Sequence, residues 1–156
     1  MNATDTATTL RIERTFDARA GDVFDAWTNP EVLRRWWATR PSMSTPIADV
    51  DLRVGGTYRL AMQDADGGPP HTVRGEYLEV RRPELLRYTW AWENEDGSVG
   101  HESTVSVHFL SEQEGTRVVL EHSGLPSADS REKHGEGWTG CLESLQRLYE
   151  HGPMSA

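Results

Sequence analysis

The fold is decided near the C-terminus, by the stretch WTGCLESLQRLY at residues 138–149. Its apolar side chains recur at the spacing of one face of an α-helix, so the stretch predicts a long amphipathic helix. No other segment of the sequence carries an apolar stripe of this length. We therefore expect this helix to cover the apolar face of a sheet formed by the preceding chain. The residues of the stripe are Trp138, Cys141, Leu142, Leu145, Leu148 and Tyr149.

Segments in which apolar and polar residues alternate precede this helix and predict β-strands. Glycine-rich turns such as Gly55-Gly56 connect consecutive segments, which implies antiparallel pairing of the strands. In one segment the apolar positions switch parity next to Tyr77, and this predicts a β-bulge. The predicted strands cover residues 10–16, 47–54, 58–62, 72–80, 86–92, 103–109 and 116–122.

Two short helices are predicted between the first two strands. The first covers residues 22–27, and the second begins at Asn29-Pro30, where asparagine is a preferred N-cap and proline suits the first turn. The segment 41–46, which contains Met43, is predicted to be irregular. This order of elements predicts an α+β domain in which a curved antiparallel sheet of about six or seven strands wraps around the C-terminal helix.

The chain is predicted to form a single domain over residues 8–150, with residues 1–7 and 151–156 as flexible tails. A chain of 156 residues is long enough to bury a sizeable core without disulfides. Its one cysteine, Cys141, excludes an internal disulfide and fits a reducing compartment. Because no signal peptide is visible either, we expect a cytoplasmic location.

The charge of the chain bears on its partners. The formal net charge is −9 and the isoelectric point is about 5.1, so phosphate backbones and anionic membrane surfaces would be repelled. No stretch approaches the roughly 20 apolar residues of a membrane span. We therefore expect neither nucleic acid nor membrane as a partner, whereas a homodimer remains open.

Motifs for cofactors, metals and nucleophilic catalysis are not found in the sequence. It has no phosphate-binding loop and no dinucleotide fingerprint, which predicts no cofactor. None of the six histidines has a second histidine four residues away, so no metal site is predicted. Cys141 lies on the apolar helix stripe, where a thiol usually packs in the core and is inert.

Aromatic side chains on the faces predicted to point inward are the strongest functional signal. Any one of them could simply fill the core, but many rings with few polar groups are typical of a ligand cavity. Arg14, His122 and His134 interrupt otherwise apolar rows. Each of these three pairs either with another buried polar group or with a ligand, and both alternatives stay open. The candidate ligand-binding residues are Arg14, Trp36, Trp37, Met43, Tyr58, Met62, Tyr77, Tyr88, Trp90, His134 and Trp138.

Several short motifs also follow one another with a characteristic spacing. They are Phe16-Asp17-Ala18, Val23 to Pro30, Trp36-Trp37, Asp51 to Gly56, Gly75 to Val80, Tyr88-Thr89-Trp90, and His134 with Gly137-Trp138. In this order they resemble the START-like (SRPBCC) superfamily, and within it the bacterial homologues of the activator of the heat-shock-protein-90 ATPase. The resemblance covers roughly residues 8–150 and implies a helix-grip fold. It also implies a small hydrophobic ligand between sheet and helix, although relatives range from lipid carriers to polyketide cyclases.

Three functions compete at this point. The first is binding of a small hydrophobic or aromatic molecule in a cavity between the sheet and the C-terminal helix, without turnover. The second is an enzyme of the cyclase, aromatase or hydrolase type, centred on His134 with Arg14 or Tyr88 as hydrogen-bonding groups. The third is a protein-interaction module of the co-chaperone kind, which requires an exposed apolar patch. Titratable groups that converge in a cavity would favour the enzyme.

Overall fold

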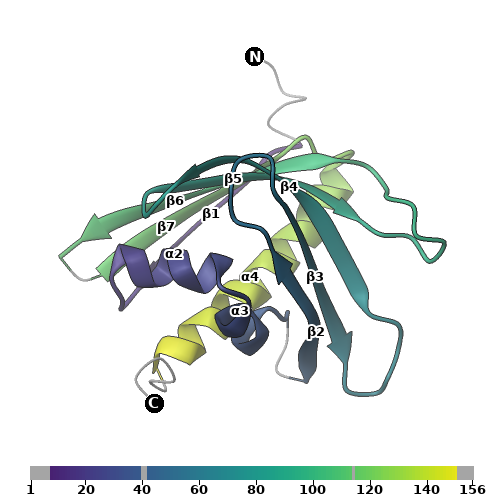
Figure 1. Cartoon of the computed structure of the whole chain (residues 1–156), viewed down its shortest axis with the longest axis horizontal. Helices are drawn as coiled ribbons and strands as arrows, with labels where there is room; N and C mark the ends of the chain where they lie inside the picture. The colour runs from purple at the N-terminus through teal and green to yellow at the C-terminus, as the bar shows by residue number, and fades with distance from the viewer. Residues whose placement is uncertain (1–7, 40–41, 114, 151–156) are drawn as a thin grey trace.

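The computed structural model describes residues 8–39, 42–113 and 115–150, so the predicted tails 1–7 and 151–156 lie outside the described residues. Seven strands and three helices follow one another in the order that the sequence predicts (Figure 1). They are β1 (Leu10–Phe16), α2 (Ala20–Thr28), α3 (Pro30–Trp36), β2 (Met43–Val50), β3 (Thr57–Asp64), β4 (His71–Arg81), β5 (Leu85–Trp92), β6 (Ser103–Glu112), β7 (Gly115–Ser123) and α4 (Ala128–Glu150).

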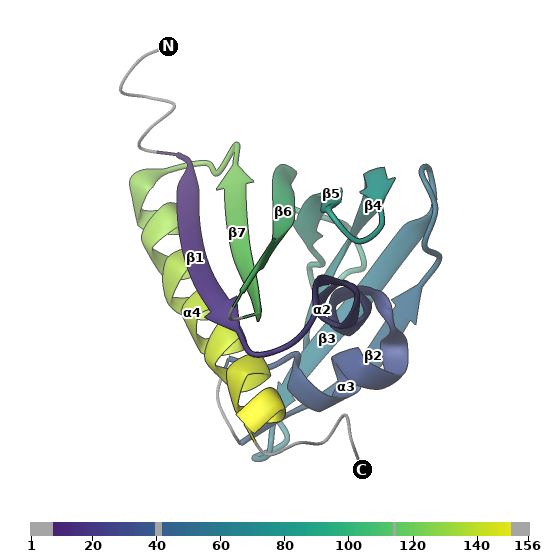
Figure 2. The same ribbon diagram turned by 90° about the vertical axis from the view of Figure 1, so that its left-hand side faces the viewer.

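The strands form one antiparallel sheet in the order β1-β7-β6-β5-β4-β3-β2. Figures 1 and 2 show the sheet curled around α4, which crosses its concave face, with α2 and α3 on the same side. The hydroxyl of Tyr149 in α4 donates to the Asp22 carbonyl of α2 at 3.4 Å, so α2 lies beside the C-terminal part of α4. This arrangement confirms the helix-grip fold that the sequence predicts.

The apolar stripe of α4 faces the core as expected. Trp138, Cys141, Leu142 and Leu145 are all at most 3% exposed. Among the described residues, no helix is long and apolar enough to span a bilayer, and α4 is no exception. Its burial against the sheet explains why an apolar face is present at all, because helices in proteins are stabilised mainly by such packing.

Local signals in the sequence also have their expected structural outcome. The Asn29 side chain accepts a hydrogen bond from the Glu31 backbone N–H at 2.9 Å, which caps α3. The pairing of β4 with β5 shifts register between Tyr77 and Glu79, which confirms the predicted bulge. After the bulge Val80 pairs with Leu86 and packs against the core, which explains the change of parity, whereas Leu78 at the bulge is 43% exposed.

The second strand differs from the prediction. It begins at Met43 rather than at residue 47, and it ends at Val50 rather than at residue 54. Pro46 had suggested an irregular segment, but β2 is an edge strand and its pairing with β3 shifts register between Ser44 and Ile47. Proline is tolerated in edge strands and at bulges because no ladder hydrogen bond is lost there. Met43 therefore belongs to a strand.

Candidate functional site

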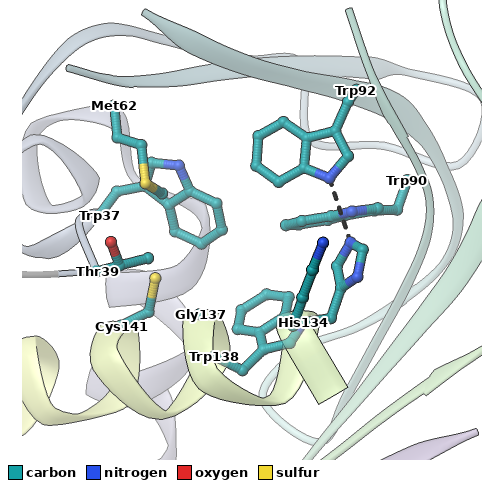
Figure 3. A pocket seen from close by; sticks show the side chains of 10 residues that line it. Trp37, Thr39, Met62, Trp90, Trp92, His134, Gly137, Trp138 and Cys141 are labelled. Carbon is teal, nitrogen blue, oxygen red and sulfur yellow. Dashed lines mark hydrogen bonds between the residues drawn. The ribbon is translucent and has the colours of Figure 1, made fainter. Parts of the chain in front are cut away.

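A cavity of about 290 Å³ lies between the sheet and the N-terminal half of α4 (Figure 3). Helix α4 supplies one wall, strands β3 and β5 supply the opposite wall, and the segment after α3 supplies a third. The absence of a side chain at Gly137 leaves part of this space open, because a Cβ atom there would meet only the Thr39 methyl group, at 3.7 Å. The lining residues are Trp37, Thr39, Met62, Trp90, Trp92, Lys133, His134, Gly137, Trp138 and Cys141.

Indole rings dominate the walls of this cavity. Trp37 follows α3, Trp90 and Trp92 come from β5, and Trp138 comes from α4. The ring centroids of Trp37 and Trp138 are 5.6 Å apart at an interplanar angle of 74°, and those of Trp90 and Trp92 are 5.4 Å apart at 85°. Edge-to-face pairs of this kind are favourable beyond the area that they bury. The four rings therefore support one another and hold the cavity open.

The segment after α3 is held against α4 by a close backbone approach. A Cβ atom at Gly140 would lie 2.3 Å from the Thr39 carbonyl oxygen, so only glycine fits at this point of the helix. The approach brings Thr39 and Trp37 onto α4 one turn from Gly137. Glycine within a helix is normally unfavourable, and here the close contact gives it a structural reason.

His134 bridges α4 and β5 at the edge of the cavity. Its Nδ1 atom donates to the Ser130 carbonyl oxygen at 2.8 Å, and its Nε2 atom accepts from the Trp92 indole N–H at 3.2 Å (Figure 3). A carbonyl can only accept and an indole N–H can only donate, so these partners assign a neutral imidazole with the proton on Nδ1. Both ring nitrogens are thus engaged within the protein.

A second histidine, His122 on β7, lies behind the cavity wall. It is fully buried, and its Nδ1 atom accepts from the Trp138 indole N–H at 3.1 Å. Its Nε2 atom lies 2.7 Å from the Ser103 hydroxyl oxygen, to which the neutral ring donates. Burial, with a smaller contribution from His134, lowers the pKa of His122 to about 3. His122 is therefore a neutral support for Trp138.

Five of the eleven residues predicted to bind a ligand line this cavity. They are Trp37, Met62, Trp90, His134 and Trp138. The sequence brings them together because α4 presents its N-terminal half to the same face of the sheet from which Met62 and Trp90 project. Within α4, the C-terminal part of the stripe packs in the core instead, as the full burial of Leu145 indicates.

Three predicted tyrosines surround a separate and much smaller void of about 10 Å³. The ring centroids of Tyr58, Tyr77 and Tyr88 are 5.2–6.0 Å apart. The Tyr58 hydroxyl donates to the Thr89 carbonyl oxygen at 2.6 Å, and the Tyr88 hydroxyl accepts from the Trp27 indole N–H at 3.2 Å. These rings pack mainly on one another and on α2.

The remaining three predicted residues do not line the cavity, and each has a hydrogen-bond partner within the protein. The Trp36 indole N–H donates to the Ala26 carbonyl oxygen at 2.8 Å, which joins the two short helices. The Arg14 guanidinium donates to the Gln146 side-chain oxygen at 2.7 Å. The sulfur of Met43 accepts a hydrogen bond from the Thr39 hydroxyl at 3.2 Å.

Five lining residues were missed by the sequence interpretation. Trp92 continues the apolar row of Trp90, and Cys141 lies on the helix stripe, so both carried a signal. Gly137 stands in the motif with His134 and Trp138 and also carried a signal, whereas Thr39 and Lys133 carried none. Burial raises the pKa of the Cys141 thiol to about 12, so the thiol stays protonated and is a poor nucleophile.

Metal-binding groups are not gathered at this site. Within the part of the chain that the structure describes, no three side chains of the histidine, cysteine, aspartate or glutamate type lie together as metal ligands would. The ammonium group of Lys133, at the edge of the cavity, lies 3.4 Å from a carboxylate oxygen of Asp129 one helical turn away. The chemistry of the cavity is therefore that of an apolar space with hydrogen-bonding groups at its walls.

Comparison with known proteins places the chain in a family. Residues 17–150 match the family described as Activator of Hsp90 ATPase homolog 1-like protein. No protein of curated function matches the sequence. Among solved structures, an AHSA1 protein from Silicibacter pomeroyi is 28% identical with a TM-score of 0.82, and the similarity covers 91% of this chain and 97% of that one.

Two further solved structures agree with this result. An AHSA1-like protein from Aeromonas hydrophila is 27% identical with a TM-score of 0.76, over 93% of this chain and 94% of that one. A protein from Nitrosomonas europaea is 26% identical with a TM-score of 0.76, over 94% of this chain and 97% of that one. The chain therefore belongs to the family of Activator of Hsp90 ATPase homolog 1-like proteins and has the START-like helix-grip fold.

Proposed function

We propose that the protein binds one small hydrophobic or aromatic molecule in the cavity between β3, β5 and α4, without converting it. The observation that carries this proposal is the four-indole wall, formed by Trp37, Trp90, Trp92 and Trp138, around a space that the chain itself leaves unfilled. Ligand sites in proteins are typically concave and lined by apolar and aromatic side chains with a few polar groups. Burial of apolar surface would supply the affinity.

The volume of the cavity limits the size of the molecule. A cavity of roughly 150 Å³ holds one benzene ring, and the space here is about 290 Å³. The ligand is therefore comparable with a two-ring molecule such as a substituted naphthalene. A larger ligand would have to displace an indole ring from its edge-to-face contacts.

Catalysis is less well supported, because the titratable groups at the cavity are committed elsewhere. Both ring nitrogens of His134 bond to protein atoms, and the thiol of Cys141 has a raised pKa. Arg14 and Tyr88, which the enzyme hypothesis requires, pair with Gln146 and a tryptophan outside this space. A general acid or base must reach the reacting group, and no free group of this kind faces the cavity in the described chain.

A protein-interaction role has weaker support as well. Leu52 and Val54 lie in one loop that hydrogen-bonds to Tyr77 next to Leu78, whereas the other exposed large apolar side chains come from other segments, so at most a small group of them lies together. Scattered apolar side chains of this kind are normal on protein surfaces. They are Leu52, Val54, Leu78, Val99 and Leu110.

The binding proposal can be tested with 2-ethylnaphthalene, a neutral probe of about the right size. At ten times its Kd the probe should raise the free energy of unfolding by about 1.4 kcal/mol, which corresponds to a rise in Tm of roughly 3–6 °C. The thiol of Cys141, the only cysteine in the chain, lines the cavity and reacts slowly with a small thiol reagent because of its raised pKa, and the probe should slow this reaction further. Mass spectrometry measures the modification.

A cavity-filling variant provides the control. Gly137→Leu places a side chain into the space beside Thr39 and should abolish both effects of the probe. Gly135→Leu adds the same side chain near Leu10, at a residue that does not line the cavity, and should leave both effects of the probe unchanged. Equal responses of both variants and the unmodified protein, or no response in any of them, would refute binding in this cavity.

A further inference from the structure

One hydrogen bond joins His134 to Trp92 at the wall of the cavity, and its acceptor is a nitrogen that can bind a proton. The Trp92 indole N–H donates to Nε2 of His134 at 3.2 Å, and Nδ1 of the same imidazole donates to the Ser130 carbonyl oxygen at 2.8 Å. Figure 3 shows the indole of Trp92 and the imidazole of His134 pointing toward each other. Both residues line the cavity, so the place of Trp92 in its wall depends on the protonation of His134.

An added proton reverses the role of Nε2. A neutral imidazole has one donor and one acceptor nitrogen, whereas an imidazolium has two donors. The Ser130 carbonyl can only accept, so Nδ1 keeps its proton and the new proton must go to Nε2. Two N–H groups then face each other where one hydrogen bond was made. The Trp92 ring, which is only half-buried, loses its acceptor and is free to turn toward water.

The groups around His134 leave it as the one whose charge changes near neutral pH. His122 on β7 faces it with the ring centroids 5.0 Å apart, but burial lowers the pKa of His122 to about 3 and keeps it neutral. On α4 itself, Lys133 and its partner Asp129 have exposed side chains of types that ordinarily stay charged between pH 5 and 7.5. Strand β5 contacts His134 through two indole rings, which do not titrate.

A neutral ligand in the cavity would interact differently with the two protonation states. When His134 is neutral, Trp92 is already in place and little conformational entropy is lost on binding. When His134 is charged, the wall loses a fixed ring, and a bound apolar molecule also removes water from the charge, which is costly. Both effects weaken the binding of a neutral apolar molecule to the protonated protein. By linkage, the bound molecule opposes protonation of His134 by the same factor.

We propose that His134 couples ligand binding to pH, so that the cavity holds a neutral hydrophobic molecule while the imidazole is neutral and releases it when the imidazole is protonated. This inference rests on the function proposed above and adds the regulation of the same site. His134 acts through Trp92 and is therefore a positioning residue. The loss of one such hydrogen bond corresponds to about a tenfold change in affinity.

Calorimetric titration with 2-ethylnaphthalene at several pH values between about 7.5 and 5 measures this coupling. The probe has no titratable group, so a change in its Kd originates in the protein. The Kd should rise about tenfold as the pH falls, with the same midpoint as the His134 ring signals in nuclear magnetic resonance of the free protein. Bound probe should move that midpoint down by about one pH unit. Circular dichroism at each pH verifies that the protein is folded.

Two substitutions separate the proton from the hydrogen bond. His134→Gln offers a side-chain oxygen to the Trp92 N–H but cannot titrate, so its Kd at pH 5 should equal its Kd at pH 7.5 and stay close to that of the unmodified protein at pH 7.5. His134→Leu has no acceptor at any pH and should bind the probe more weakly, again without pH dependence. His71→Gln removes an exposed imidazole of β4 and should keep the pH dependence of the unmodified protein.

The free protein gives a readout that needs no ligand. The indole ¹H–¹⁵N signal of Trp92, identified by its loss in Trp92→Phe, should move with the titration of His134. The signal of Trp138, which is bonded to His122, should respond much less. The coupling is overturned if the probe binds with the same Kd at pH 5 and 7.5, or if the Trp92 signal does not follow the His134 ring. Failure of the probe to bind at any pH would instead overturn the proposed function.

Discussion

The buried histidine His122 makes the stability of the protein depend on pH in a window that can be calculated. In the folded protein its pKa lies at about 3, whereas an unfolded chain has the ordinary value of 6.5. Between these two values the unfolded state binds a proton that the folded state cannot accept. Stability is therefore fully present above pH 6.5 and falls as the pH decreases through this window.

The size of the effect follows from linkage. One proton changes the free energy of unfolding by about 1.4 kcal/mol for each pH unit inside the window. Between neutral pH and pH 5 the contribution of His122 amounts to about 2 kcal/mol, which is a substantial part of the 5–15 kcal/mol typical of a folded protein. Carboxylates do not interfere here: hydrogen bonding to Arg59 lowers the pKa of Glu93, for example, so its contribution is lost only below 4.5.

Urea denaturation at several pH values between about 7.5 and 5 measures this dependence directly. His122→Gln keeps a hydrogen-bonding group beside Ser103 but cannot titrate. As the pH falls over this range, its free energy of unfolding should therefore decrease by about 2 kcal/mol less than that of the unmodified protein. His71→Gln removes an exposed imidazole and serves as the control for the loss of a histidine. Equal pH dependences of the His122 variant and the unmodified protein would refute the reasoning, as would a midpoint above pH 5 for the His122 ring signals in a magnetic resonance titration.

Two further predictions concern α4. Leu145→Ala should destabilise the protein by about 2–5 kcal/mol in urea denaturation, because it leaves a hole in the fully buried part of the helix. Leu110→Ala, at a site that is 38% exposed, should have a much smaller effect. Gly140→Ala should also be destabilising, because its Cβ atom would lie 2.3 Å from the Thr39 carbonyl oxygen. The control Gly21→Ala lies in helix α2 with no atom within 4 Å of the new Cβ, and it should stabilise by about 0.5–1 kcal/mol. If both glycine variants shift stability in the same direction, the close approach at Thr39 is not what requires glycine.

The elements that could be predicted from the sequence are those whose burial leaves a periodic pattern. Val105, Val107 and Phe109 alternate along β6 and are all buried, and the stripe of α4 repeats at helical spacing. The bulge at Tyr77 was predictable for the same reason, since an extra residue reverses the parity. The start of β2 at Met43 was not, because Pro46 is unfavourable in most strands and only the edge position permits it.

The candidate site could be predicted only in part, because an inward-facing ring can line a cavity or fill the core. Tyr88 and Trp90 occupy equivalent positions on β5 and carry the same sequence signal. Tyr88 meets Trp27 from α2, which fills the space opposite it. Trp90 faces the part of α4 at Gly137, where a side chain is missing. The difference lies in the element packed opposite, and a pattern along one strand contains no information about it.

Hydrogen bonds of the indole N–H groups fix two of the four cavity tryptophans in place. Trp92 donates to His134 and Trp138 donates to His122, so these two rings keep their positions without a ligand. A wall that is already in place loses little conformational entropy on binding, which favours affinity. The N–H groups of Trp37 and Trp90 have no acceptor among the described residues, so packing alone holds these two rings. The partner of each indole N–H thus decides whether a ring of this wall is fixed by a hydrogen bond or by packing alone.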